Sequence, residues 1–276
     1  MKFTRRRFLQ GLGAAAAAAG GGAWYTFVFE PGNLTVEEVV VTIPGLATGL
    51  EGTRIGLLSD FHLYPFIDVP HVEKAVALMN GLDVDVVALT GDFVLERAEA
   101  IFDLGPVLAG LRARQGVFAV LGNHDYWTNA AVVRQGLAEV GIEELNNRGV
   151  ALPVNGERLF LAGVDDGWSG RPDLGAAVAE VEAGDGVILL SHEPDLADEY
   201  GRLGVVDLQL SGHSHGGQVR VPGGGALLLP YLGQKYDMGL YGAEGVQVYT
   251  TRGVGMVGPP GRFNCPPEVT VLTLVG

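Results

Sequence analysis

Six short apolar segments of this chain end in a residue that can bind a metal ion or transfer a proton. They are RIGLLSD (54–60), VDVVALTGD (84–92), GVFAVLGNHD (116–125), LFLAGVDD (159–166), GVILLSHEP (186–194) and VVDLQLSGHSH (205–215). Near-continuous apolar runs of this kind, ended by Gly, Asp or His, are typical of buried strands. The segments between them have a helical period, over 69–80, 95–112, 129–140, 172–181 and 194–202. This alternation predicts an α/β fold.

The C-terminal part of the chain has a different character. Its apolar runs, at 218–230, 246–255 and 268–274, are separated by Gly and Pro turns rather than by strong helices. They predict strands with mixed or antiparallel pairing. The chain has 276 residues, 47% of them hydrophobic, so it can bury a full core. Because it has no internal repeat and no second boundary, residues 31–276 are expected to form a single domain.

Residues 1–30 form a separate segment with the pattern of an export signal. A basic start is followed by an uncharged stretch over residues 8–29, as in signal peptides. The sequence TRRRFL at residues 4–9 resembles a twin-arginine signal, so the export machinery of that pathway is an expected partner. The alternative is an ordinary membrane anchor. Both place residues 31–276 outside the cytoplasm, in the periplasm or its equivalent, because positive flanks stay inside.

The fate of this segment stays open at the level of sequence. Small residues at 14–19 offer cleavage sites. However, about 20 apolar residues suffice to cross a bilayer, so residues 8–29 can equally remain as an anchor and associate the protein with the membrane.

The charge balance excludes one class of partner. With 18 Lys and Arg against 32 Asp and Glu, the formal net charge is -14. A nucleic-acid-binding protein needs a basic surface to neutralise phosphates, and beyond the first ten residues the sequence has no basic stripe. Nucleic acid is therefore not expected as a standing partner. The single cysteine, Cys265, cannot form an internal disulfide and is expected to be a small buried apolar residue.

The polar residues that follow the strands predict a metal centre. In open α/β sheets, sites form beyond the carboxyl ends of strands, so these groups are expected to converge on one crevice. His213 and His215 are one residue apart and must therefore lie where a strand gives way to a loop. Five of the six histidines fall in these motifs, and only His71, on an expected helix, lies outside and is expected to be structural.

The composition of the candidate ligand set favours two metal ions. Carboxylates, imidazoles and one amide, without a thiolate, suit Zn, Mn or Fe. Seven ligands are too many for one tetrahedral site with an open position, whereas they suit two ions that share a bridge. The candidates are Asp60, His62, Asp92, Asn123, His192, His213 and His215.

In order and spacing, these motifs resemble the five sequence blocks of the calcineurin-like metallophosphoesterases. The blocks are Asp60-x-His62, Gly91-Asp92, Gly122-Asn123-His124-Asp125, Ser191-His192 and Gly212-His213-x-His215. The resemblance implies a sandwich of two mixed β-sheets flanked by helices. It also implies one metal ion on Asp60, His62 and His215, and a second on Asn123, His192 and His213, with Asp92 bridging them. Two further residues, His124 and Asp125, would be catalytic, with His124 beside the ions and Asp125 orienting it.

Within this family, the chain is similar to exported phosphodiesterases with a twin-arginine signal or membrane anchor. Two cations about 3.5 to 4 Å apart can supply a bridging hydroxide near neutral pH, so no protein nucleophile is needed. The sequence also has no Gly-x4-Gly-Lys-Ser/Thr phosphate loop,. His124 is expected to act as general acid or electrostatic stabiliser.

Two pairs of residues outside the motifs also carry charge that could bear on the site. Asp165 and Asp166 either hold an imidazole in place from outside the ligand set or lie in a solvated loop. Arg252 and Arg262 are expected to form surface salt bridges rather than to meet a substrate phosphate.

The expected function is hydrolysis of a phosphodiester at the cell envelope. The stretch GGGALLLPYLG (223–233) and an anchor favour a phospholipid or lipid-linked substrate, although core packing explains the leucines equally well. An alternative implied by the resemblance is a UDP-2,3-diacylglucosamine pyrophosphohydrolase of the lipid A pathway. Export argues against it, because nucleotide sugars are cytoplasmic. A non-catalytic scaffold would be expected to have lost metal ligands, and none is lost in this sequence. A single-metal hydrolase or oxidoreductase would be expected to bind one ion per chain.

Overall fold

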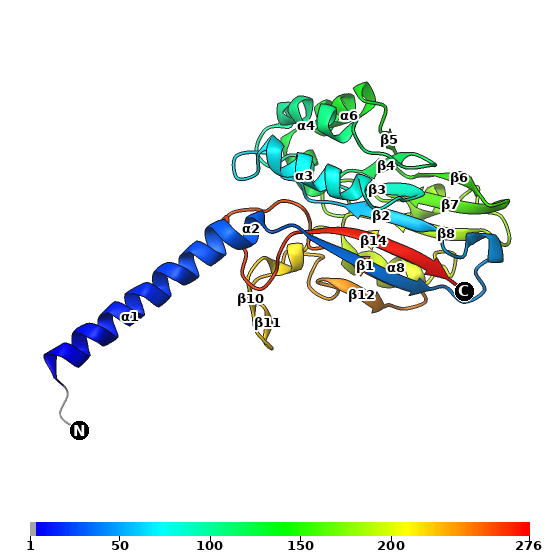
Figure 1. The fold of residues 1–276 in the computed structure, drawn as a ribbon. Helices are drawn as coiled ribbons and strands as arrows, with labels where there is room; N and C mark the ends of the chain where they lie inside the picture. The colour runs from blue at the N-terminus through cyan, green and yellow to red at the C-terminus, as the bar shows by residue number, and fades with distance from the viewer. Residues whose placement is uncertain (1–3) are drawn as a thin grey trace.

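The computed structural model of the chain describes residues 4–276, so the first three residues of the expected signal lie outside the described part. Two six-stranded sheets pack face to face, and helices cover the outer face of each (Figure 1). This is the expected α/β sandwich of two mixed sheets flanked by helices.

The first sheet has the strand order β1-β14-β2-β3-β4-β5. Neighbouring strands run parallel except for β14 and β2, which are antiparallel. The bounds are β1 (Thr35–Thr42), β14 (Glu268–Val275), β2 (Arg54–Leu58), β3 (Val86–Thr90), β4 (Val117–Val120) and β5 (Glu143–Glu144).

The second sheet has the order β12-β13-β9-β8-β7-β6, parallel in its middle and antiparallel at both edges. The bounds are β12 (Gly239–Gly242), β13 (Gln247–Thr250), β9 (Leu208–Ser211), β8 (Gly186–Leu190), β7 (Glu157–Gly163) and β6 (Arg148–Val154). A separate hairpin pairs β10 (Arg220–Val221) with β11 (Gly225–Ala226). The mixed pairing expected for the C-terminal strands is confirmed.

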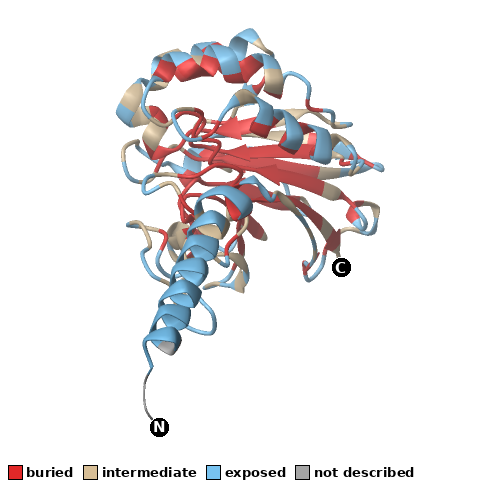
Figure 2. Cartoon of the chain, turned by 60° about the vertical axis from the view of Figure 1, so that its left-hand side comes forward, coloured by how far each residue is buried: buried red, intermediate tan, exposed pale blue. Residues whose placement is uncertain are grey.

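Three apolar layers hold the sandwich together. The central layer lies between the sheets, where side chains such as Leu57 and Leu161 are fully buried. A second layer joins the first sheet to α3 (Val69–Asn80), α4 (Ile101–Leu108) and α6 (Ala130–Glu139). A third joins the second sheet to α7 (Leu174–Ala177) and α8 (Ala197–Gly201). Burial therefore runs through both sheets while the outer helix faces stay exposed (Figure 2).

The observed helices match the predicted ones best where a capping residue and a helical period coincide in the sequence. The helix expected at 69–80 is α3, which Asp68 caps by accepting the N–H of His71 at 3.1 Å. The segment 95–112 is helical only over Ala98–Leu108, first as a 3-10 turn and then as α4. The expectation for 172–181 was wrong in length, because α7 has only four residues; Gly175 and β-branched Val178 are weak helix formers.

The N-terminal helix α1 (Arg5–Trp24) projects away from the sheets (Figure 1). Residues Phe8–Gly32 form a helical segment long and apolar enough to cross a membrane, and its most apolar 18-residue stretch is not buried, as both a signal and an anchor require. A π-turn (Tyr25–Phe29) and α2 (Glu30–Gly32) follow. The ring of Tyr25 packs against that of Phe263, with 5.7 Å between the ring centroids.

Replacing Leu161 tests the layer between the sheets. Leu161→Ala is expected to lower the free energy of unfolding by about 2 to 5 kcal/mol, because the site cannot collapse fully around the missing atoms. Leu203, which is 58% exposed, provides the control: Leu203→Ala is expected to stay within about 0.5 kcal/mol of the parent. Equilibrium denaturation in one detergent measures both. Equal stabilities for the two variants would contradict a shared core.

Candidate metal centre

The carboxyl ends of five parallel strands from both sheets meet at one edge of the sandwich. Within the first sheet, the N–H of Asp60 after β2 donates to the carbonyl of Gly91 after β3 at 2.9 Å. Between the sheets, Nδ1 of His192 after β8 lies 2.6 Å from the carbonyl of Thr90 at the end of β3. The predicted convergence of strand ends is thus what the fold produces.

Three triads of candidate ligands form at this edge, each with its ligand atoms within 4.8 Å of one another: Asp60, His62 and His215; Asp92, His192 and His213; and His62, Asp92 and His124, which overlaps the other two. In the first, Oδ1 of Asp60 lies 3.4 Å from Nε2 of His215 and 3.8 Å from Nε2 of His62. The two Nε2 atoms are 3.0 Å apart. Both imidazoles therefore direct the same nitrogen toward one point.

The second triad adjoins the first through Asp92. Oδ2 of Asp92 lies 3.2 Å from Nε2 of His192, and that nitrogen is 3.2 Å from Nδ1 of His213. The same carboxylate oxygen is 3.4 Å from Nε2 of His62 in the first triad. Asp92 therefore faces both ligand groups, as a bridging residue must.

Much of this geometry depends on an unusual backbone. A positive φ, which side chains with a Cβ disfavour, occurs at Asp60, His62, Asp92, His213 and His215. Such conformations cost about 1 to 3 kcal/mol each and cluster at functional sites. Gly212 matters for another reason, since a Cβ there would clash with Ser59 Oγ and the Asp60 carboxylate. As expected, His213 and His215 both lie beyond the end of β9.

Burial keeps most of the imidazoles neutral. It lowers the pKa of His62 and of His213 to about 3 and lowers that of His215 well below its ordinary value. A neutral imidazole is the form that binds a metal ion. His192 differs: burial would lower its pKa, but the charge of Asp92 and a hydrogen bond with it raise the pKa well above the ordinary value. Metal binding there displaces a proton.

The carboxylates are buried without a matching number of cationic side chains. Burial raises the pKa of Asp60 to about 7, with His192 opposing and Asp92 reinforcing the effect. Burial acts on Asp92 in the same direction, but the charges of His192, His62 and His124 outweigh it and hold its pKa well below the ordinary value. Buried carboxylates of this kind are stabilised by bound cations, which are the largest local charges in such sites.

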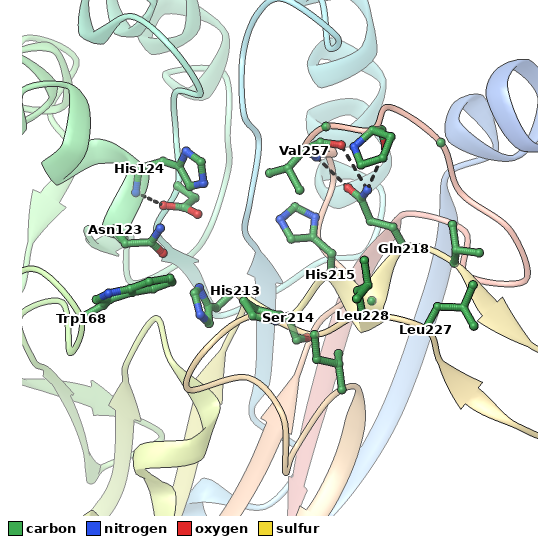
Figure 3. Close-up of a pocket in the computed structure, with 18 of the residues that line it drawn as sticks. Asn123, His124, Trp168, His213, Ser214, His215, Gln218, Leu227, Leu228 and Val257 are labelled. Atoms are coloured by element: carbon green, nitrogen blue, oxygen red, sulfur yellow. Dashed lines mark hydrogen bonds between the residues drawn. The ribbon is translucent and has the colours of Figure 1, made fainter.

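The donor set fits bound metal ions. Oδ1 of Asn123 is buried and has no hydrogen-bond partner among residues 4–276, although a buried amide oxygen ordinarily has one. Asn123, His213 and His215 all face the same cavity (Figure 3). Oxygen and imidazole donors without a thiolate suit Zn, Mn or Fe, as the sequence indicated.

Asp125 has a different role from the expected one. Its two carboxylate oxygens accept backbone N–H groups of Gly122, Asp92, Phe93 and Val94 at 2.9 to 3.3 Å. The imidazole of His124 instead directs Nδ1 toward the carbonyl of Leu95 at 3.4 Å. Asp125 thus fixes the loops that carry Asp92 and Asn123 rather than the ring of His124, because carboxylates this deep satisfy clustered backbone donors.

Some of the candidate ligands, Asp92, Asn123, His213 and His215, line a cavity of about 670 Å³. Aromatic side chains that the sequence did not single out form one wall: Trp127 packs against His124 at 4.7 Å and against Trp168 at 5.0 Å. Buried Glu193 holds the loop that carries Trp168 by accepting the backbone N–H of Trp168 at 3.1 Å. The one signal in the sequence is position, since each Trp closely follows a strand-end motif.

Four residues outside the triads are structural. Nε2 of His71 bonds to the carbonyl of Val254 at 2.9 Å, and Cys265 is buried, both as expected. Arg252 pairs with Glu37 at 2.6 Å. The surface role expected for Arg262 was wrong: its side chain is fully buried and donates to the carbonyls of Cys265, Arg252 and Gly255. Three carbonyl acceptors replace water around the guanidinium.

The two aspartates after β7 do not join the ligand triads. Asp166 is buried and accepts the N–H of Ser169 at 2.5 Å, while Asp165 accepts the N–H of Arg171 at 2.9 Å and the hydroxyl of Tyr126. They shape the loop that carries Trp168. Among the hydrogen bonds of residues 4–276, neither aspartate bonds to an imidazole, and the expectation of a solvated loop was wrong for Asp166, which is buried.

The sequence profile of the calcineurin-like phosphoesterase family matches residues 53–217. The chain belongs to this family. Two relatives match along 99% of this chain: the uncharacterized metallophosphoesterase YkuE of Bacillus subtilis strain 168, 32% identical with 98% of its length covered, and phosphodiesterase YaeI of Escherichia coli strain K12, 33% identical with 99% covered. As a calcineurin-like phosphoesterase, the chain is a metal-dependent phosphohydrolase.

Comparison with solved structures supports the fold of this calcineurin-like phosphoesterase. A 5'-nucleotidase precursor from Thermus thermophilus superposes with a TM-score of 0.51 at 16% identity, over 80% of this chain and 54% of that one. At this identity the likeness concerns the fold alone.

Asp125→Asn tests the role of the loop carboxylate. Asparagine keeps one acceptor oxygen and turns an NH₂ group toward backbone donors, so Mn²⁺ affinity is expected to fall about 10- to 100-fold although Asp125 is not a ligand. Asp207→Asn is the control, because Asp207 accepts one backbone N–H through a single oxygen, at 2.8 Å, which asparagine retains. Calorimetric titration with Mn²⁺ distinguishes them. Unchanged affinity in Asp125→Asn would contradict the assignment.

Proposed function

We propose that this phosphoesterase binds two metal ions and hydrolyses phosphodiester bonds at the cell envelope. The observation that carries the proposal is the position of Asp92, whose Oδ2 lies 3.4 Å from His62 Nε2 and 3.2 Å from His192 Nε2. One carboxylate thus faces two ligand sets. The first consists of Asp60, His62 and His215, and the second of Asn123, His192 and His213, with Mn, Zn or Fe as the ions that this chemistry favours.

When bound, such an ion pair supplies Lewis acidity and a water whose pKa is low enough to provide hydroxide near neutral pH. The chain's own residues arrange the substrate around it. His124 donates its backbone N–H to Oδ1 of Asp92 at 2.9 Å, and its ring packs edge-on against His62 at 4.8 Å. This geometry supports a position for its imidazole beside the ligand sets.

In the proposed reaction His124 serves as the general acid. A water molecule releases one proton to solvent and its oxygen forms a bond to phosphorus, while the bond between phosphorus and the leaving alcohol oxygen breaks. The imidazolium of His124 gives its proton to that oxygen, a transfer that contributes about 100- to 10,000-fold in typical enzymes.

The cavity favours a diester over a monoester. Among its lining residues in the described chain there is no Lys or Arg, and most of the wall is apolar or aromatic. A phosphate diester carries one charge and two organic groups, so it needs less cationic compensation than a dianionic monoester. The relative named phosphodiesterase supports the same choice. A lipid-linked substrate and a location outside the cytoplasm complete the proposal, supported by the apolar span with its basic N-terminal flank,.

His124 and His192 are expected to respond differently to replacement. His124→Ala should lower kcat about 100- to 10,000-fold while the metal content holds at two ions per chain. His192→Ala should retain about one ion, since a ligand of one set is lost while the other set remains complete. Elemental analysis and turnover are measured on the same samples. His71→Gln, outside the centre, is the control and should match the parent in both.

Substrate preference tests the reaction class. With Mn²⁺ added, bis-p-nitrophenyl phosphate should be hydrolysed faster than p-nitrophenyl phosphate, and chelation followed by dialysis should abolish both activities. Equal or faster monoester hydrolysis would overturn the diester assignment. A fully metallated protein without activity on either ester would favour the non-catalytic scaffold instead.

A further inference from the structure

We infer that the mouth of this cavity lies against the lipid bilayer that α1 enters, and that its apolar side takes an acyl chain of a phosphodiester lipid. The inference rests on the proposed function, specifies its lipid-linked substrate as a phosphodiester lipid, and adds the route by which that lipid enters. Three uncharged parts of the chain, far apart in sequence, form the rim on which it depends.

The first part of the rim is the end of the N-terminal helical segment. Thr26 and Phe27 line the same cavity as His213 and His215. The carbonyl of Thr26 accepts the N–H of Arg262 at 2.9 Å, which fixes this segment to the domain. The 20 residues of α1 extend about 30 Å, which matches the thickness of a bilayer core. A bilayer crossed by α1 therefore begins at the cavity mouth.

The second part is the β10–β11 hairpin with the loop that follows it. Leu227 and Leu228 line the cavity, yet they are 60% and 80% exposed. The stretch 221–234 contains no charged residue. The hairpin projects from the domain on the side where α1 leaves it (Figure 1). Exposed apolar side chains that gather at one place mark a membrane or binding surface rather than a water-facing loop.

The third part is the loop over 257–261, which is also uncharged. Gln218 holds it by donating to the carbonyl of Val257 at 3.1 Å and accepting its N–H at 2.7 Å (Figure 3). The same framework ties the hairpin to the helix segment, because Arg220 donates its backbone N–H to the carbonyl of Phe263 at 2.9 Å, and the ring of Phe263 contacts Tyr25. Hairpin, loop and helix end are therefore joined by direct contacts.

The charge distribution favours a bilayer over a protein partner. The chain carries a net charge of -14, so most of its surface is repelled by anionic lipid headgroups. The uncharged rim is the face that can approach them. The cavity beneath the rim has a volume of about 670 Å³, which is the size of ordinary ligand sites. An acyl chain that enters it between Phe27 and Leu228 would place the phosphate of the same lipid at the candidate metal ligands.

Depth-dependent quenching tests the bilayer contact without any activity assay. The full-length protein is reconstituted in phosphatidylcholine vesicles that contain brominated acyl chains. Leu228→Cys carries the fluorophore in one sample and Leu203→Cys in the control; Leu203, 58% exposed, precedes β9 and so lies at the strand end opposite the site. Buried Cys265, whose pKa is raised by burial, stays unlabelled. Strong quenching of the Leu228→Cys label alone is expected, and equal quenching of both labels overturns the inference.

A matched pair of esters tests the acyl-chain side of the cavity. In the same vesicles, p-nitrophenyl hexadecyl phosphate is expected to have a higher kcat/KM than p-nitrophenyl methyl phosphate. Leu227→Gln combined with Leu228→Gln should lower the ratio of the two values about tenfold or more, because apolar contacts are lost. Leu203→Gln should keep the parent ratio, which accounts for partitioning of the ester into the membrane.

The two esters distinguish a failure of this inference from a failure of the proposed function. Hydrolysis of both esters without preference, or a ratio unaffected by the double variant, overturns the acyl-chain assignment alone. If the metal-loaded protein hydrolyses neither ester, the proposed function is overturned, and the inferred substrate class is overturned as well.

Discussion

The candidate metal centre depends on carboxylates and imidazoles that are buried away from water at the ends of strands from both sheets. Asp60 and Asp92 are buried side by side, and burial alone would drive both toward their neutral forms. Isolated carboxylates in such a place are costly unless cations accompany them. Their surroundings are correspondingly elaborate: the backbone turns left-handed at five candidate ligands, Asp125 gathers the backbone donors of two loops, and Gly212 lets His213 approach Asp60. All of this supports one arrangement of ligand atoms.

The fold class and the clustering of the candidate ligands at the strand ends could be predicted from the sequence because both follow from local pattern. Apolar runs buried on two faces mark the central strands, and their polar ends mark the site. Edge strands such as β1, in which mostly half-buried positions alternate with exposed ones, carried a weaker signal, and α7 ended early. Properties set by tertiary contacts have no comparable local signal. Arg262 is charged yet buried against carbonyl groups, and Phe27, Trp168 and Leu228 meet only because distant loops close one cavity. The positions of these side chains are set by packing in three dimensions, which cannot be read from their spacing along the chain.

The N-terminal segment and the catalytic domain are physically continuous. Glu30 is buried and accepts the N–H of Cys265, while Cys265 Sγ lies 3.3 Å from the carbonyl of His215. A short chain of contacts thus connects the end of the membrane-compatible helix with a candidate metal ligand. In relatives that match along nearly the whole chain, the shared length includes this segment. The end of the N-terminal segment and the candidate site therefore form one structural unit, to which the rim that we propose to face lipid also belongs.

Anomalous diffraction from crystals grown with Mn²⁺ tests the central claim most directly. We predict two peaks about 3.5 to 4 Å apart, on either side of the Asp92 carboxylate, one beside Asp60 and His215 and the other beside Asn123 and His213. A single peak under saturating Mn²⁺, or two peaks that do not share Asp92, would contradict it.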